Sequence, residues 1–149
     1  MITAPEVSIG ADIGAGTIDI AARFVKDQPT PAMPAIDVAD GVTLSARGLW
    51  VNDMPGMQAG GVTARIDGGT IRLKAETIAD GPGSYSTQGQ IAFGEGVTLD
   101  ADGGGWLKAN GELAGGDGGE ISVVGYFVEG WESVEAHAYG IDQGGALTL

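Results

Sequence analysis

Closely spaced carboxylates are the side chains of this sequence that could most readily do chemistry. Asp100 and Asp102 stand two residues apart, and three glutamates lie within 129–135. Residues two apart in a strand share a face, so the two aspartates could chelate a hard cation such as calcium. The aspartate that calcium-binding β-rolls place after their glycines is missing from GGDGGEISV at 115–123. Such carboxylates are usually only solvated, and we predict no metal ligand.

Nucleophilic and nucleotide chemistry have weaker support in the sequence. His137 is the only histidine, and no serine stands near it at a spacing that suggests a catalytic set, so we expect a surface histidine. The absence of cysteine excludes thiolate nucleophiles, thiolate metal sites and disulfides. The run ADIGAGTIDI at 11–20 is similar to the phosphate-binding hairpin of actin-like ATPases, but nothing else in the chain supplies that fold. We predict no catalytic residue, no cofactor and no enzymatic activity.

An aromatic segment is the strongest candidate for binding. Four aromatic residues lie within YFVEGWESVEAHAYG at 126–140, among three glutamates. Aromatic faces beside carboxylates are typical of sugar recognition, through stacking and hydrogen bonds to hydroxyl groups. The competing interpretation is that Phe127 and Trp131 pack in the core. We predict Tyr126, Trp131 and Tyr139 as contacts for a glycan or another partner.

Charge and hydropathy limit the classes of partner. Twenty acidic and seven basic residues give the 149-residue chain a formal charge of -13. This charge disfavours nucleic acid and anionic membrane surfaces, because both select clusters of lysine and arginine. The sequence has no run of 18 apolar residues, so we expect no membrane insertion. The residues after Met1 also lack the basic and apolar regions of a signal peptide.

A repeat must position these candidate residues. Six triplets place Ile, Val or Leu on both sides of a polar residue, and they begin at positions 18, 42, 71, 97, 121 and 147, at nearly constant intervals. This alternation is typical of a strand with one buried face. Asp-Gly and Asn-Gly pairs between the triplets indicate turns. No segment has the spacing of an amphipathic helix, so we predict almost no helix.

Two all-β folds fit this pattern. Hairpins would build an antiparallel β-sandwich, but strands would then recur about every 8 to 12 residues. An interval of about 25 residues instead suits one coil of a solenoid with two or three short strands. We predict a single all-β unit over residues 1–149, a parallel β-helix of about six coils with roughly 25 residues each. An antiparallel β-sandwich is the alternative.

The chain resembles filamentous haemagglutinin-like large exoproteins, most specifically in SARGLWVND at 45–53 and more generally in DGGTIRLKA at 67–75 and GEGVTLDADGG at 94–104. The resemblance covers residues 37–149. It implies a right-handed β-helical shaft, export by two-partner secretion through an outer-membrane β-barrel transporter, and adhesion at the bacterial cell surface. The N-terminal secretion domain of such proteins is not recognisable here, and the chain is far shorter. We therefore expect an internal segment of a longer exoprotein.

Two functional hypotheses follow. The leading hypothesis is a non-catalytic shaft segment of a secreted adhesin on the bacterial cell surface, with a host or cell-surface glycan or receptor as partner. The alternative is a β-helical carbohydrate-binding or carbohydrate-active domain. Paired carboxylates favour it, because glycosidic cleavage commonly uses two of them. Against catalysis stands the scatter of the seven basic residues, which would bind an acidic polymer poorly.

Overall fold

The computed structural model describes residues 2–4, 6–25, 35–56, 65–78, 85–86 and 89–149. These residues form short strands that are mostly parallel, and they contain no α-helix. A single 3-10 turn, η1 (Trp131–Ser133), interrupts the all-β structure of this described part. None of the described segments forms a helix that is long and apolar enough to cross a membrane.

The longest sheet, called here the β4 sheet, consists of parallel neighbours. In spatial order they are β1 (Ile2–Ala4), β4 (Thr17–Val25), β8 (Thr70–Ile78), β14 (Glu120–Val124) and β17 (Ala146–Thr148). A short strand, β9 (Tyr85–Ser86), pairs with β8 in the antiparallel sense. Because every other neighbour in this sheet is parallel, consecutive strands must be joined by crossovers and not by hairpins.

Two shorter parallel sheets accompany it. The β5 sheet has the order β2 (Val7–Ile9), β5 (Ile36–Val38), β10 (Gln90–Phe93) and β15 (Phe127–Glu129). The β6 sheet has the order β3 (Ile13–Gly14), β6 (Thr43–Ser45), β11 (Thr98–Asp100) and β16 (Glu135–His137). All pairs in both sheets are parallel. The antiparallel sandwich considered as an alternative has no such sheets.

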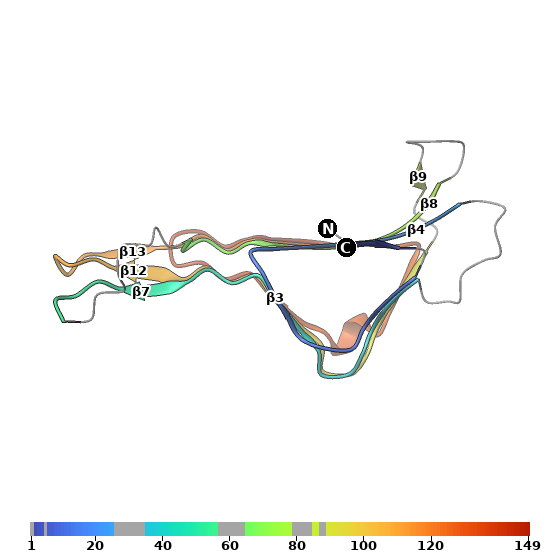
Figure 1. Cartoon of the computed structure of the whole chain (residues 1–149), viewed down its shortest axis with the longest axis horizontal. Coiled ribbons are helices and arrows are strands. Elements are labelled where there is room, and N and C mark those ends of the chain that lie inside the picture. Colours follow the sequence, from blue (N-terminus) through green and yellow to red (C-terminus); the bar gives the residue numbers. More distant parts are fainter. Residues whose placement is uncertain (1, 5, 26–34, 57–64, 79–84, 87–88) are drawn as a thin grey trace.

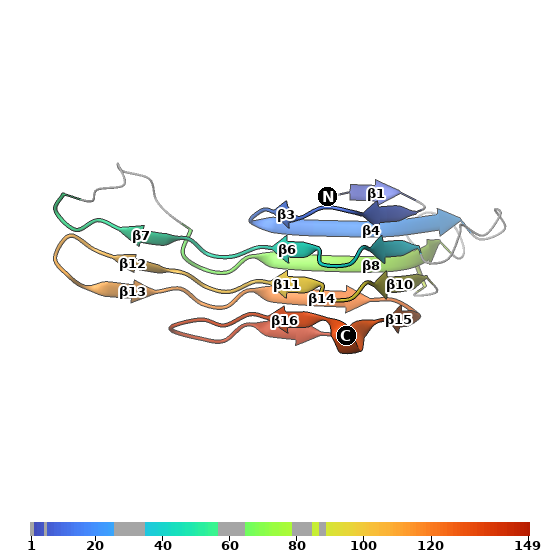
Figure 2. The same ribbon diagram turned by 90° about the horizontal axis from the view of Figure 1, so that it is seen from below.

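The chain passes through the three sheets in a fixed order: the β5 sheet, then the β6 sheet, then the β4 sheet. Four passes give four layers, namely β2–β3–β4, β5–β6–β8, β10–β11–β14 and β15–β16–β17. In Figure 1 the sheets are seen end-on along the sides of a triangle, with β4 on its upper side and β3 on a lower one. Figure 2 shows the layers stacked on one another. We call these layers the body.

The apolar positions of the first five triplets are buried in the body, as the alternation predicted, whereas Leu147 and Leu149 of the last triplet are 51% and 62% exposed. Ile18, Ile71 and Ile121 are buried and adjacent in register in the β4 sheet. Leu44 and Leu99 are buried partners in the β6 sheet. Residues from all three sheets form one hydrophobic cluster, so the body has a single core. Burying each such side chain stabilises the fold by roughly 1.5–3 kcal/mol relative to exposure.

The predicted period, however, does not describe the stacking, and six coils is wrong. Ile18 pairs with Ile71, and Ile71 pairs with Ile121, so each partner stands two triplets further along the chain. The intervening triplets lie in the β6 sheet, where Thr43 pairs with Thr98. The interval from one triplet to the next therefore usually joins strands in different sheets. Only the last interval, which ends at Leu147, advances one layer within the same sheet.

Excursions from the body explain the longer layers. The second and third layers leave the β6 sheet for a separate three-stranded sheet, the arm, before they enter the β4 sheet. The arm contains β7 (Trp50–Asn52), β12 (Gly105–Leu107) and β13 (Leu113–Gly115); β7 and β12 are parallel, and β12 and β13 form an antiparallel hairpin. Figure 1 shows it extending to the left of the triangle. The fourth layer lacks this excursion and is correspondingly short.

A repeated backbone clasp joins the β6 sheet to the β4 sheet in the second, third and fourth layers. The carbonyls of Ala46, Ala101 and Ala138, just after the β6-sheet strands, accept hydrogen bonds from Gly69, Gly119 and Gly145, just before the β4-sheet strands, at 2.6, 2.8 and 2.8 Å. The chain segments approach so closely here that a Cβ at Gly68 would lie 2.0 Å from the carbonyl oxygen of Ala101. Glycines predicted as turn residues therefore serve close backbone approach at this corner. Gly41, by contrast, is a true turn glycine, with φ of 69°.

Candidate functional site

Register brings a histidine and two aspartates together on the β6 sheet. His137 of β16 pairs directly with Asp100 of β11, and Asp102 follows two residues later. Leu99, between Thr98 and Asp100, faces the core, so Asp100 projects from the opposite face of the strand. These residues are far apart in sequence, and only the pairing of β11 with β16 makes them neighbours. We call them the Asp–His cluster.

Every member of the Asp–His cluster has an internal partner. His137 Nδ1 lies 2.9 Å from Asp102 Oδ1 and 3.5 Å from Asp100 Oδ1. Asp100 Oδ2 lies 3.2 Å from Nε of Arg47, and its Oδ1 accepts the N–H of Asp102 at 3.0 Å. Asp102 Oδ1 also accepts the N–H of Tyr139 at 2.7 Å. The Asp100 side chain is only 8% exposed, so this pairing offsets the cost of burying its charge.

His137 is more enclosed than the surface histidine expected from sequence. Its side chain is 19% exposed, and its ring stacks on that of Tyr139 with centroids 5.7 Å apart and an interplanar angle of 10°. Nothing in one sequence could signal the contact with Asp100, because the two residues belong to strands of different layers.

The Asp–His cluster does not form a hydrolytic triad. Along the β6 sheet the order is Ser45, Asp100, His137, with the aspartate between the other two. Neighbouring strands are about 4.8 Å apart, so Ser45 and His137 lie roughly 10 Å apart across two strand spacings. A triad needs the histidine between the nucleophile and the acid. The arrangement can orient His137, but Asp100 stands between that histidine and Ser45.

The same three side chains are the metal-ligating group that the described residues contain. One ligand atom from each of Asp100, Asp102 and His137 lies within 4.8 Å of the others. Carboxylate oxygens with one imidazole would suit zinc or another divalent transition metal. A cation would compete with Arg47 for Asp100, because that guanidinium already lies against Oδ2.

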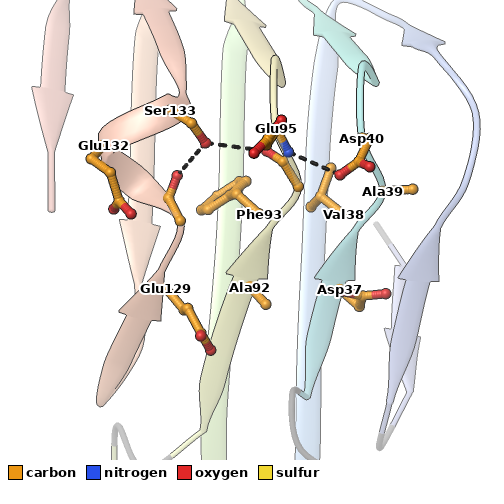
Figure 3. A pocket seen from close by; sticks show the side chains of 12 residues that line it. Asp37, Val38, Ala39, Asp40, Ala92, Phe93, Glu95, Glu129, Glu132 and Ser133 are labelled. Carbon is orange, nitrogen blue, oxygen red and sulfur yellow. Dashed lines mark hydrogen bonds between the residues drawn. The ribbon is translucent and has the colours of Figure 1, made fainter.

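An acidic groove of about 650 Å³ crosses the end of the β5 sheet and the turns that follow its strands. Five carboxylates from the second, third and fourth layers line it: Asp37, Asp40, Glu95, Glu129 and Glu132. Figure 3 shows Asp40 and Glu95 on adjacent turns, and Asp40 Oδ1 accepts the N–H of Glu95 at 2.9 Å. Phe93 lies among the lining residues, and its ring meets the edge of Trp131 with centroids 5.8 Å apart. The groove therefore presents mainly carboxylates to solvent, because Phe93 belongs to the core and is only 6% exposed.

The three residues predicted to contact a glycan have different surroundings. Tyr126 is 79% exposed beside β15, and Tyr139 is 73% exposed after β16. Trp131 is partly buried and packs against the core, which agrees with the competing packing interpretation for that residue. Since β15 and β16 belong to different sheets, the two tyrosines flank different sides of the body.

Sequence reasoning did not anticipate the apolar surface of the arm. Trp50 is 65% exposed, and an apolar hollow of about 330 Å³ lies between it, Leu107 and Leu113. On the neighbouring strand, Trp106 Nε1 donates to Asp53 Oδ2 at 2.7 Å, and Lys108 Nζ lies 5.9 Å from the centre of the Trp106 ring. The sequence shows Trp50 and Trp106 only as two isolated tryptophans, and the pairing of β7 with β12 brings them together.

Comparison with known proteins identifies no relative. A scan against protein-family models matches no family, and searches of curated proteins and of solved structures find no match. The resemblance to filamentous haemagglutinin-like exoproteins therefore stays a prediction from sequence.

Proposed function

We propose that this chain is a non-catalytic structural segment, a right-handed parallel β-helical shaft. The observation that carries the proposal is the single apolar core shared by three parallel sheets, which the chain visits in the same order four times. Such a body is stabilised by contacts between neighbouring layers, and its length grows by adding layers. A rod built in this way acts as a spacer that holds apart the parts of a protein attached to its two ends.

The shaft belongs, in this proposal, to a secreted adhesin exported by two-partner secretion. The motif that carries the resemblance runs from Ser45 at the end of β6 through β7 to Asp53. It thus covers the place where the chain leaves the body for the arm. A chain without cysteine also crosses an oxidising compartment without forming disulfides. The outer-membrane transporter is its export partner, and a surface glycan or receptor its target.

Surface labelling of the source cells tests this assignment. Antibody raised against the chain should bind intact cells, and binding should disappear when the cognate outer-membrane transporter is deleted. Labelling that requires lysis of the cells would contradict export. In parallel, the purified chain should release no reducing ends from a panel of polysaccharides, and sustained release would favour an enzyme.

One observation favours carbohydrate binding as a second candidate. Tyr139 exposes a ring that is stacked on His137, and Asp102 holds both residues through the His137 ring nitrogen and the Tyr139 N–H. A rigid aromatic face beside a carboxylate can stack on a sugar ring. Tyr139→Ala should abolish any glycan-array signal of the parent, while Tyr126→Ala, a similarly exposed tyrosine, should retain it. Equal loss in both variants, or no signal for the parent, would remove this candidate.

A further inference from the structure

A second hollow lies where the arm leaves the body. In the first layer the chain turns directly from β3 to β4, whereas in the second layer it leaves β6 for the arm. Figure 2 shows the arm extending beyond the corner of the first layer. The step between the two layers bounds a hollow of about 530 Å³, lined by residues 14–16 of the first layer and, from the second, by residues within 45–50 and Arg65. We call it the corner hollow, and its volume is typical of small-ligand sites.

Arg65 brings a positive charge to the corner hollow that no carboxylate balances within the described residues. Carboxylates lie against all the other described basic side chains: Arg23, Arg47, Arg72, Lys74 and Lys108. The guanidinium of Arg65 donates instead to the carbonyl oxygens of Gly16 at 3.4 Å and Arg47 at 2.8 Å. These acceptors are neutral, so the charge of Arg65 remains available to an anion.

The same two contacts hold the guanidinium in place. Its Cζ lies so close to Gly16 that a Cβ there would be 3.3 Å away. The two hydrogen bonds use two of the five N–H groups of a guanidinium, and a carboxylate can accept from two others. Because the side chain is already positioned, binding costs less conformational entropy than at a free surface arginine.

Trp50 joins the corner hollow to the apolar hollow of the arm. It lines both of them, and it shares the second with Leu107 and Leu113. The indole lies over Gly105, where a Cβ would be 2.9 Å from Cζ3, so the missing side chain leaves room for the ring. The ring is largely exposed, as is Leu49 beside it. A positive charge and an exposed apolar surface therefore adjoin each other at one indole.

From this arrangement we propose that the base of the arm binds a small monocarboxylate with an apolar body, such as a medium-chain fatty acid. The carboxylate pairs with Arg65, and the alkyl chain lies across Trp50 into the hollow of the arm. Burial of the chain against these apolar side chains adds to the pairing of opposite charges.

The surroundings favour this ligand over other anions. None of the described residues that line the two hollows is an aspartate or glutamate. The whole chain nevertheless has a formal charge of -13, which repels a polyanion more than a ligand with one charge. Most side chains lining the hollow of the arm are apolar, which favours an alkyl chain over a sugar with its hydroxyl groups. The proposal concerns the folded chain alone and does not depend on export or on the adhesin assignment.

Titration with octanoate, below its micelle concentration and followed by NMR, tests the proposal. The indole N–H resonance of Trp50 and the Nε–H resonance of Arg65 should shift and saturate. The indole resonance of Trp131, which packs against the core, should stay in place. Octanol lacks the charge and acetate lacks the apolar body, so each should bind the parent at least about tenfold more weakly than octanoate.

Variants separate the contribution of charge from that of apolar contact. Arg65→Gln should weaken octanoate binding by about tenfold and leave octanol binding unchanged. Arg72→Gln removes another exposed arginine, one that pairs with Glu120, and should bind octanoate as the parent does. Trp50→Ala should weaken the binding of both ligands. Arg65→Lys keeps the charge and should retain the preference for octanoate over octanol.

Four results would overturn the proposal. They are the absence of a saturable shift with octanoate, equal binding of octanoate and octanol, unchanged octanoate binding in folded Arg65→Gln, and tighter binding of glucuronate than of octanoate. The second would indicate apolar contact alone, and the fourth would assign the site to an acidic sugar. If Arg65→Gln unfolds, the comparison of octanoate with octanol in the parent decides.

Discussion

The body and the arm are built from the same short strands, yet different interactions hold them. In the body, Ile71 and Leu73 are fully buried, and the core continues from layer to layer. In the arm, Trp50 and Leu113 remain largely exposed, so apolar burial contributes less. The arm depends on backbone pairing, on the Trp106–Asp53 hydrogen bond and on the Lys108–Glu112 ion pair at 2.8 Å. Stability should therefore be concentrated in the body.

Replacing an apolar residue by aspartate in each region should give the largest difference in the free energy of unfolding. Ile121→Asp places a charge in the core at a residue that is 1% exposed, and we expect a loss of about 4 kcal/mol or more in the free energy of unfolding. Leu113→Asp changes a residue of the arm that is 53% exposed, and we expect a loss below about 1 kcal/mol. Urea unfolding measures both. Similar losses would mean that the arm is part of the same cooperative core.

The junction between the two regions should be nearly as sensitive. Gly68→Ala puts a Cβ within 2.0 Å of the Ala101 carbonyl oxygen, so the backbone of the clasp must shift. We expect a loss of about 2–3 kcal/mol, as for other overpacking changes. Gly10→Ala is the control, because a Cβ there meets nothing within 4 Å. Its effect on the free energy of unfolding should stay within about 0.5 kcal/mol. A larger effect would mean that replacing any glycine destabilises the protein, whether or not its Cβ meets a neighbour.

An ion pair between the exposed Arg47 and the nearly buried Asp100 also ties the start of the arm to the body. Asp100→Asn weakens the contacts with Arg47 and His137 at a side chain that is almost buried, and we expect a loss of about 1–3 kcal/mol. Asp37→Asn, on the exposed face of β5, removes the same charge at a residue that lies in solvent. Thermal unfolding of the pair separates the two cases. Equal melting temperatures would show that the Asp–His cluster contributes nothing to stability.

The smallest expected effect is a pH dependence confined to the arm. Hydrogen bonds from Lys108 and Asn110, with the charge of Lys108, lower the pKa of Glu112 below 4.5. A carboxylate with a lowered pKa stabilises the folded hairpin above its unfolded pKa, and this contribution is lost as pH falls through the lowered value. Glu112→Gln should remove the acid-dependent shift of the Lys108 and Glu112 amide resonances in NMR titration. The amide resonance of a residue in the body, such as Leu99, should shift with pH in the same way in both proteins.

The sequence predicts which residues are buried better than it predicts which strands pair with one another. Ile18, Leu73 and Val123 are buried because alternation alone decides which side of a strand is apolar. The interval between triplets gave the wrong number of coils, because the alternation of apolar and polar residues does not show which strands are neighbours in a sheet. The arm inserts residues between Ala46 and Gly69 without disturbing the clasp that joins them. A layer can thus contain about twice as many residues and still pair with its neighbouring layers in the same register.

The candidate site shows the same limit. Asp100 and Asp102 were recognisable as a pair because they are close in sequence, but Arg47 and His137 reach them only through the pairing of β11 with its neighbours. Glycines were predicted to make turns, which holds for Gly41 and Gly111. At Gly68 the requirement is space for a second backbone segment, and that segment lies elsewhere in the sequence.

Disulfide trapping tests the stacking of layers most directly, because the chain has no cysteine of its own. Thr43 and Thr98 are register partners on neighbouring strands, at a spacing of about 4.8 Å that permits a disulfide. Thr43 and Arg72 lie in different sheets, although they would be neighbours in a coil of about 25 residues. The double variant Thr43→Cys/Thr98→Cys should form an intramolecular disulfide under mild oxidation, and Thr43→Cys/Arg72→Cys should not. The reverse result would contradict the four-layer architecture.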